Sequence, residues 1–231
     1  MPDRMEAVTN AGPGRPRLTK QRRPGPTAQA EILDAAAELF TTKGFASTST
    51  RQIAEMVGMR QASLYHHFAT KDDILAALLE QTVTAPLELA NRLAATTEPA
   101  AVRLYALLLF DSGQLMAGRW NLGALYLLPE LRTERFSRFR EERQQLRRRY
   151  REFATAVLAE LGTDDESRAG LPFRIVETVI NERSDAEGGG TGAGEQSPAL
   201  LAEAGLRVLG RHDAESLRAQ AERLLATTRS T

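Results

Sequence analysis

Residues 50–75, which read TRQIAEMVGMRQASLYHHFATKDDIL, carry the pattern that decides the fold. Two short helices are predicted in this stretch, separated by a tight turn at Gly58. Ser49, followed three residues later by Gln52, fits a capping box at the start of the first of them. The buried side of that helix would consist of Ile53, Ala54 and Val57. The next helix should cover roughly Gln61 to Phe68, with Leu64 and Phe68 one turn apart and facing inward.

Helices are also predicted on both sides of this stretch. The one before it should run from about Thr27 to Lys43 and end at Gly44, where a left-handed residue suits a helix C-terminus. The one after it should begin at Thr70, which with Asp73 resembles a helix cap. The apolar face of the earlier helix consists of Leu33, Ala36, Ala37 and Phe40. That of the later helix consists of Ile74, Leu75, Leu78 and Leu79. Helices this short, joined by a tight turn, are typical of a helix-turn-helix module.

The exposed flank of the Gln61–Phe68 helix is the candidate binding surface. Burial of Leu64 and Phe68 would turn Gln61, Ser63 and Tyr65 to the other side. A helix fits the major groove of DNA, where Gln can pair with adenine, Arg with guanine, and a methyl group can touch thymine. We therefore expect Arg60, Gln61 and Ala62 near base edges. Arg51 is a further candidate for a base or phosphate contact.

The same stretch resembles the DNA-binding signature of the TetR family of regulators. The matching parts are T-x-x-I-A-x-x-x-G, then S-L-Y-x-H-F, then K-x-x-I/L-L, and the resemblance covers about residues 27–80. It implies an all-α fold, with an N-terminal three-helix helix-turn-helix domain and a larger helical ligand-binding and dimerisation domain. It also implies phosphate contacts from Thr50, Tyr65, His67 and Lys71, which match positions of the signature. The DNA-binding set is then Arg15, Arg17, Thr50, Arg51, Arg60, Gln61, Ala62, Ser63, Tyr65, His66, His67 and Lys71.

Plainer interpretations exist for several of these residues. Tyr65 could belong partly to the core, and His66 or His67 could simply pack or cap a helix. Adjacent histidines diverge on a helix and have no acidic partner at i+4, so we expect no metal, and nothing implies a cofactor. Lys71 could be a surface charge. Its place at a helix N-terminus, where the macrodipole disfavours a cation, instead suggests an anionic partner.

The N-terminal segment is basic and rich in Pro and Gly. Gly14-Arg15-Pro16-Arg17 looks like a minor-groove hook, in which arginine enters the narrow groove of A·T-rich DNA. The alternative is a tail that is merely solvated. We accordingly divide the chain into a basic arm (1–26), the helix-turn-helix domain (27–75) and the helical ligand-binding and dimerisation domain (76–231).

The C-terminal two-thirds of the chain is expected to enclose an apolar cavity. Arg103, Met116, Arg119, Trp120 and Tyr126 are the candidate ligand-binding residues, although the favoured interpretation of each is ordinary core or surface, because most such residues merely pack. Pro86 should kink or restart a helix, Pro99 should open one, and a long helix should span Leu131–Leu161. By the resemblance, helices at Leu171–Arg183 and Ala199–Leu209 would pair with those of a second copy. Their expected seam is Phe173, Val176, Ile180, Leu201 and Val208.

Two further segments of this region have simple explanations. The glycine-rich stretch 187–194 lacks the ending of a phosphate-binding loop and is expected to be a connector. The arginine-rich run from Arg132 to Arg151 is most simply the solvent-exposed face of the long helix. The alternative is a second surface that binds nucleic acid.

Composition limits the class of protein. Formal net charge is zero, 42% of residues are hydrophobic and there are no cysteines, which excludes disulfides and thiolate metal sites. No apolar run is long enough to span a bilayer, so we expect a cytoplasmic protein with no membrane contact. No catalytic motif appears, so we do not expect an enzyme.

The expectation is a ligand-responsive repressor that binds a palindromic double-stranded DNA operator as a homodimer and responds to an unknown small-molecule effector. An activator, a ligand-independent regulator and, less favoured, an architectural DNA-binding protein are the alternatives.

Overall fold

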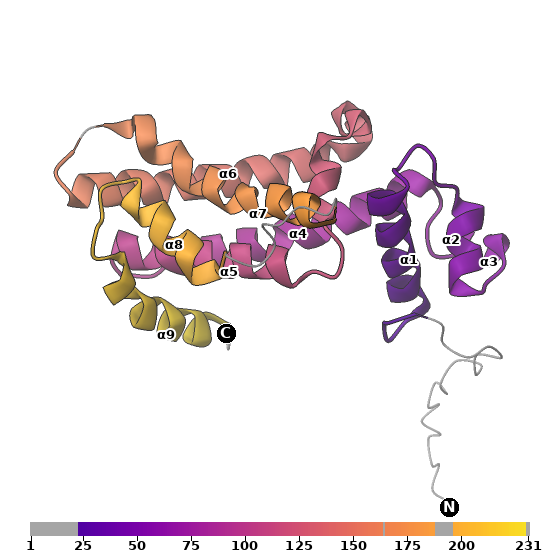
Figure 1. Cartoon of the computed structure of the whole chain (residues 1–231), viewed down its shortest axis with the longest axis horizontal. Coiled ribbons are helices and arrows are strands. Elements are labelled where there is room, and N and C mark those ends of the chain that lie inside the picture. The colour runs from indigo at the N-terminus through magenta and orange to yellow at the C-terminus, as the bar shows by residue number, and fades with distance from the viewer. Residues whose placement is uncertain (1–22, 164, 188–195, 230–231) are drawn as a thin grey trace, which may run out of the picture.

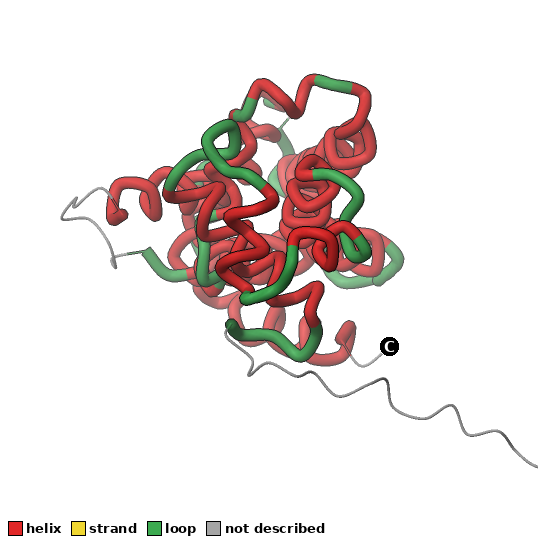
Figure 2. Tube along the Cα trace, turned by 90° about the vertical axis from the view of Figure 1, so that its right-hand side faces the viewer, coloured by secondary structure: helices red, strands yellow, loops and turns green. Residues whose placement is uncertain are grey.

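The computed structural model describes residues 23–163, 165–187 and 196–229, and within these ranges every regular element is a helix (Figure 2). The all-α prediction is therefore confirmed. The elements form two parts, a small head made by the first three helices and a longer helical body (Figure 1). The basic arm with Arg15 and Arg17 and most of the glycine-rich connector lie outside the described residues.

The head consists of α1 (Ala28–Thr42), α2 (Thr50–Val57) and α3 (Gln61–Tyr65). Thr27 caps α1, and Ser49 and Gln52 form the predicted capping box of α2. Gly58 ends α2 with φ of 73°, a left-handed conformation that glycine adopts without strain. The third helix is shorter than predicted, because it ends at Tyr65 and is followed by a turn at His66 and His67, with Phe68 after the turn.

A single long helix, α4 (Lys71–Ala94), joins the head to the body. The predicted cap of Thr70 and Asp73 is present, but the predicted interruption at Pro86 is not, since α4 continues through it. Proline has no N–H to donate to the carbonyl four residues earlier, which is that of Thr82. The Gln114 side chain donates to this carbonyl instead, at 2.7 Å, so the proline leaves no unpaired group.

The body is arranged around α5 (Ala100–Ala117), which contacts α4, α6, α7, α8 and α9. The surrounding helices are α6 (Ser137–Glu160), α7 (Leu171–Glu187), α8 (Pro198–Arg207) and α9 (Arg218–Arg229). Short 3₁₀ turns connect them: η1 (Leu122–Leu127), η2 (Pro129–Arg132), η3 (Glu134–Phe136), η4 (Glu166–Gly170) and η5 (Ala214–Leu217). Of the helices in the described residues, none combines the length and the apolarity that crossing a membrane would require.

The long helix predicted from Leu131 begins only at Ser137. The Arg140 guanidinium donates to the carbonyls of Leu131 and Thr133, and these contacts hold the preceding residues in 3₁₀ turns. The rest of the prediction for this helix is confirmed, because its apolar stripe is buried. That stripe is Phe139, Leu146, Tyr150, Phe153 and Val157.

Much of the predicted dimer seam lies inside the single chain. Phe173, Val176 and Leu201 are buried in the core of the body and are not free to meet a second copy. Helical periodicity identifies an apolar face but does not tell which neighbour covers it, and here α5 does. On the same two helices, Leu171 and Leu200 are the large apolar side chains that remain exposed, at 42% and 43%.

Candidate nucleic-acid interface

Two buried side chains fix the orientation of α3. Leu64 is completely buried and Phe68 is 6% exposed, both in the core of the head, as predicted. The opposite flank therefore faces outward: Ala62 and Ser63 are exposed, and Tyr65 is 47% exposed. In the assembled chain α3 lies at the outer edge of the head, away from the body (Figure 1). The flank is thus open to a large partner.

Three polar side chains of α2 and α3 form a hydrogen-bonded cluster on this flank. The Gln61 amide nitrogen donates to Thr50 Oγ1 at 2.9 Å and to Tyr65 Oη at 3.2 Å. The Thr50 and Tyr65 hydroxyl oxygens are 3.1 Å apart. Both amide protons of Gln61 are thereby used, while its carbonyl oxygen can still accept a hydrogen bond. The Thr50 and Tyr65 hydroxyls both accept from Gln61, and one of the two donates its proton to the other. The proton of the second hydroxyl is therefore left for an outside acceptor.

The flanking cations and imidazoles are also at the surface. Arg51 is exposed and forms an ion pair with Glu55 at 2.8 Å; this hydrogen bond raises the pKa of Arg51. Arg60 occupies the N-cap position of α3 and is exposed. His66 and His67 are exposed as well, so neither is packed in the core. The described residues contain no group of three His, Cys, Asp or Glu side chains able to hold a metal ion.

Lys71 has a structural partner that the sequence did not reveal. Its ammonium donates to the carbonyls of Phe45 and Thr48, both at 2.8 Å, and lies 4.1 Å from the centre of the Phe45 ring. These contacts tie the start of α4 to the turn between α1 and α2. The cation at this helix N-terminus is therefore explained without an anionic partner, and the macrodipole argument for a phosphate contact no longer holds.

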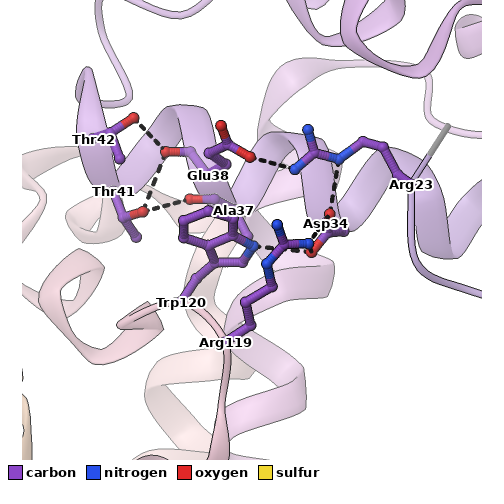
Figure 3. A network of polar contacts seen from close by, with 8 residues as sticks. All are labelled: Arg23, Asp34, Ala37, Glu38, Thr41, Thr42, Arg119 and Trp120. Atoms are coloured by element: carbon purple, nitrogen blue, oxygen red, sulfur yellow. Dashed lines mark hydrogen bonds and ion pairs between the residues drawn. The ribbon is translucent and has the colours of Figure 1, made fainter.

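A polar network centred on Asp34 of α1 joins the head to the body (Figure 3). The Trp120 indole donates to Asp34 at 2.9 Å and Arg119 pairs with it at 3.1 Å, both from the turn between α5 and η1. Arg23, which follows directly on the undescribed N-terminal residues, pairs with Asp34 at 2.7 Å and also with Glu38. Burial disfavours the charged carboxylate, but these hydrogen bonds and charges outweigh it and lower the pKa of Asp34.

The turn that holds Trp120 is bound to α7 on its other side. The Asn121 side chain donates to the Ile180 carbonyl and to Ser184 Oγ, each at 2.9 Å. Arg183 donates to the Gly118 carbonyl at 2.6 Å. A continuous chain of contacts thus runs from Arg23 through α1 and the α5–η1 turn to α7.

The predicted ligand-binding residues do not come together around one cavity. Arg119 and Trp120 line a crevice of about 450 Å³ between α1, α4 and the α5–η1 turn. Tyr126 donates to Thr82 at 2.6 Å and lines a different crevice, whereas Arg103 stacks over Phe153. Neither Arg103 nor Met116 is among the residues that line these crevices. The space inside the body, beside the buried Asp111, is only about 20 Å³. The enclosed cavity that we predicted is therefore not found there.

Comparison with known proteins relates the head and the body to bacterial regulators. Residues 32–78 match the family model described as bacterial regulatory proteins, tetR family. The crystal structure of Mycobacterium smegmatis AmtR is 58% identical and superposes with a TM-score of 0.83, covering 90% of this chain and 98% of AmtR. The fatty acid metabolism regulator of Bacillus subtilis is 27% identical over 161 residues, 70% of this chain and 80% of that protein. The repressor KstR2 of Mycobacterium tuberculosis is 43% identical over 49 residues, 21% of this chain and 24% of KstR2.

Proposed function

The chain belongs to the TetR family of bacterial transcriptional regulators, and from that premise we propose that it is a ligand-responsive repressor that acts as a homodimer on a palindromic operator. Of the relatives reported above, the Bacillus subtilis protein is named a regulator and KstR2 a repressor. The observation that carries the proposal is the orientation of α3, whose buried Leu64 leaves Gln61, Ala62, Ser63 and Tyr65 on an open flank.

We assign different tasks to the residues of this flank. Thr50 and Tyr65, with His66 and His67 beside them, bind phosphates, since hydroxyls and imidazoles suit that contact. Arg51, Arg60, Ala62 and Ser63 lie near base edges. Gln61 positions the two hydroxyls and offers its carbonyl oxygen to a base amino group, such as that of adenine or cytosine. Lys71 supports the head from within.

The basic arm extends this interface. Arg15 and Arg17 enter the minor groove next to the half-site, and Arg23 fixes the base of the arm to α1 through Asp34 and Glu38. Deletion of residues 2–22, which spares Arg23, should lower operator affinity and flatten its dependence on salt, because fewer counterions are released. The measurement is operator affinity between about 50 and 200 mM salt, the range over which contacts between cations and phosphates weaken strongly. An unchanged slope would remove the arm from the interface.

Dimer formation and ligand response complete the proposal. One recognition helix reads few bases, whereas two helices about 34 Å apart read successive major grooves. The exposed Leu171 and Leu200 of the adjacent α7 and α8 suit a contact with a second copy. The contacts of Asp34, Trp120 and Asn121 couple α7 to α1, so an effector that shifts the α5–η1 turn would alter the position of the head.

In vitro selection from a pool of random duplexes tests the function. We expect the full-length chain to enrich a palindrome whose half-sites are about one helical turn apart, and to bind it at least ~10³-fold more tightly than a scrambled duplex. Equal affinity for all duplexes would contradict the proposal and favour an architectural protein. Screening the bound complex against a panel of small molecules then tests the ligand response.

Tyr65→Phe tests the assignment of the hydroxyl cluster. Removal of one phosphate hydrogen bond should weaken binding about 3- to 10-fold, and by the same factor for operator and scrambled duplexes, because a phosphate contact carries no sequence information. The ring is retained and the lost hydrogen bonds to Gln61 and Thr50 are exposed to water, so the melting temperature should change little. A shift of base preference at a single operator position would instead mean that Tyr65 reads a base.

A further inference from the structure

Four arginines line a crevice between η1–η2 and α6. Arg140, Arg143 and Arg147 recur at intervals of three and four residues, which places them on one face of α6. Arg132 of η2 lines the same crevice. Arg140 binds backbone carbonyls and Arg143 pairs with Glu177, but within the described part of the chain Arg132 and Arg147 have no ion-pair partner. The described residues that line the crevice include no carboxylate. Its charge is therefore positive and only partly compensated.

Five of the ten residues that line the crevice are apolar, and we call these five its floor. Its volume is about 380 Å³, within the range of ordinary small-molecule sites. One of these residues, Leu127, is 92% exposed and can contact a bound molecule directly. The apolar lining consists of Tyr126, Leu127, Leu128, Leu131 and Phe139.

Arg143 adds an unsatisfied donor. Its guanidinium lies 4.9 Å from the centre of the Tyr126 ring, and its Nε is buried with no hydrogen-bond partner in the described chain. Buried donors without a partner are rare in folded proteins and call for an explanation such as a bound group. Arginine side chains, an unsatisfied donor and apolar side chains in one crevice together suit one kind of molecule, which has an anionic head and a hydrocarbon tail.

We propose that this crevice between η1–η2 and α6 binds a free single-chain amphiphilic anion, with its head on Arg132 and Arg147 and its tail against Leu127 and the floor. The site is distinct from the interior of the body and from the Asp34 junction. Two of its lining residues, Leu131 and Phe139, pack in the same apolar cluster as Leu64, and Arg135 of the adjoining η3 pairs with Asp73 at the start of α4. A molecule bound in the crevice would therefore change the contacts that η2, η3 and α6 make with the head and with the start of α4. This regulatory consequence rests on the proposed function, whereas the binding itself does not.

Calorimetric titration of the full-length chain in the absence of DNA tests the site. The probes are dodecanoate below its micellar concentration, dodecyltrimethylammonium with the same tail and opposite charge, and acetate with the charge and no tail. We expect dodecanoate to bind once per chain, and the other two to bind at least about tenfold more weakly, because each lacks one of the two recognition elements. Equal binding of the anionic and cationic amphiphiles would reveal non-specific adsorption and overturn the proposal.

Variants locate the site. Arg132→Gln combined with Arg147→Gln should weaken dodecanoate binding at least about tenfold. Arg148→Gln, at an exposed arginine next along α6 that does not line the crevice, should leave it unchanged. All three arginines are exposed, so neither protein should lose its fold, and melting temperatures check this.

Two further outcomes would overturn the proposal. One is an equal effect of the double variant and Arg148→Gln on dodecanoate binding. The other is a failure of dodecanoate to bind while the double variant loses affinity for a duplex without operator, which would assign the arginines to nucleic acid. Because the titration contains no DNA, either result leaves the operator selection unaffected, and failure of the selection would not affect the titration.

Discussion

Leu64→Ala is expected to lower the free energy of unfolding by about 3–5 kcal/mol, as for other fully buried leucines whose truncation leaves a cavity. Leu64 is completely buried and lies in α3, a helix of five residues with no side-chain cap. So short a helix has little intrinsic stability and depends on packing for its position. Urea denaturation of the two proteins measures the difference.

Leu127→Ala is the matched control for this experiment. The same truncation at a leucine that is 92% exposed should change the unfolding free energy by less than about 0.5 kcal/mol. Similar losses in the two variants would mean that Leu64 does not anchor α3. The orientation of the proposed DNA-binding flank would then lack its physical cause.

Asp111→Asn is expected to make the protein more stable at alkaline pH and to remove part of its pH dependence. Asp111 is buried in the body and accepts a hydrogen bond from Tyr150 Oη at 2.9 Å. Burial, with the nearby Glu177 carboxylate as a further cause, raises the pKa of Asp111 to about 7, although the bond from Tyr150 opposes this. Glu177 is itself paired with Arg143. Asparagine keeps an acceptor for Tyr150 and carries no charge at any pH.

The sign of the effect follows from the two states of the chain. Between the ordinary aspartate pKa near 4 and the folded value near 7, the unfolded chain has released a proton that the folded chain retains. The stability of the wild type therefore falls as pH rises through this window and levels off above it, by at most about 4 kcal/mol. In urea denaturation at pH 5, 6, 7 and 8, the free energy of unfolding of the variant should rise relative to that of the wild type by about 2–3 kcal/mol between pH 5 and pH 8.

The exposed Asp185 provides the control for Asp111. Asp185→Asn removes a carboxylate at the surface, so the difference from the wild type should change little across the same pH values. A constant difference between Asp111→Asn and the wild type would show that Asp111 is ionised in the folded protein throughout. The explanation by burial would then be wrong.

Local patterns predicted the head of this protein well. The caps at Ser49 and Thr70 and the turn at Gly58 depend on neighbouring residues in the chain, and each is found where the sequence placed it. The burial of Leu64 follows from helical periodicity in the same way. The exposed candidates of α3 could therefore be named without a structure.

Contacts between distant residues account for what the sequence did not predict. Pro86 does not break α4, because Gln114 of another helix bonds the carbonyl that the proline leaves free. Lys71 has its partners 26 and 23 residues earlier, at Phe45 and Thr48. Asp34 looked like an ordinary polar residue of the first helix, and only the fold brings Trp120 to it. No signal in the sequence links residues that are so far apart. For the same reason, the sequence could not show that the predicted ligand-binding residues lie in several separate places.

The most direct test of the central claim, that the α3 flank opposite Leu64 contacts DNA, is the operator affinity of Ala62→Glu, measured by fluorescence anisotropy at fixed salt. Ala62 is exposed on that flank, so the substitution should leave the melting temperature unchanged. A carboxylate placed against DNA costs several kcal/mol, which corresponds to a loss of about 100-fold or more. Ala159→Glu, at an exposed alanine near the end of α6, should bind operator as the wild type does. Wild-type affinity in Ala62→Glu, or equal losses in both variants, would contradict the account.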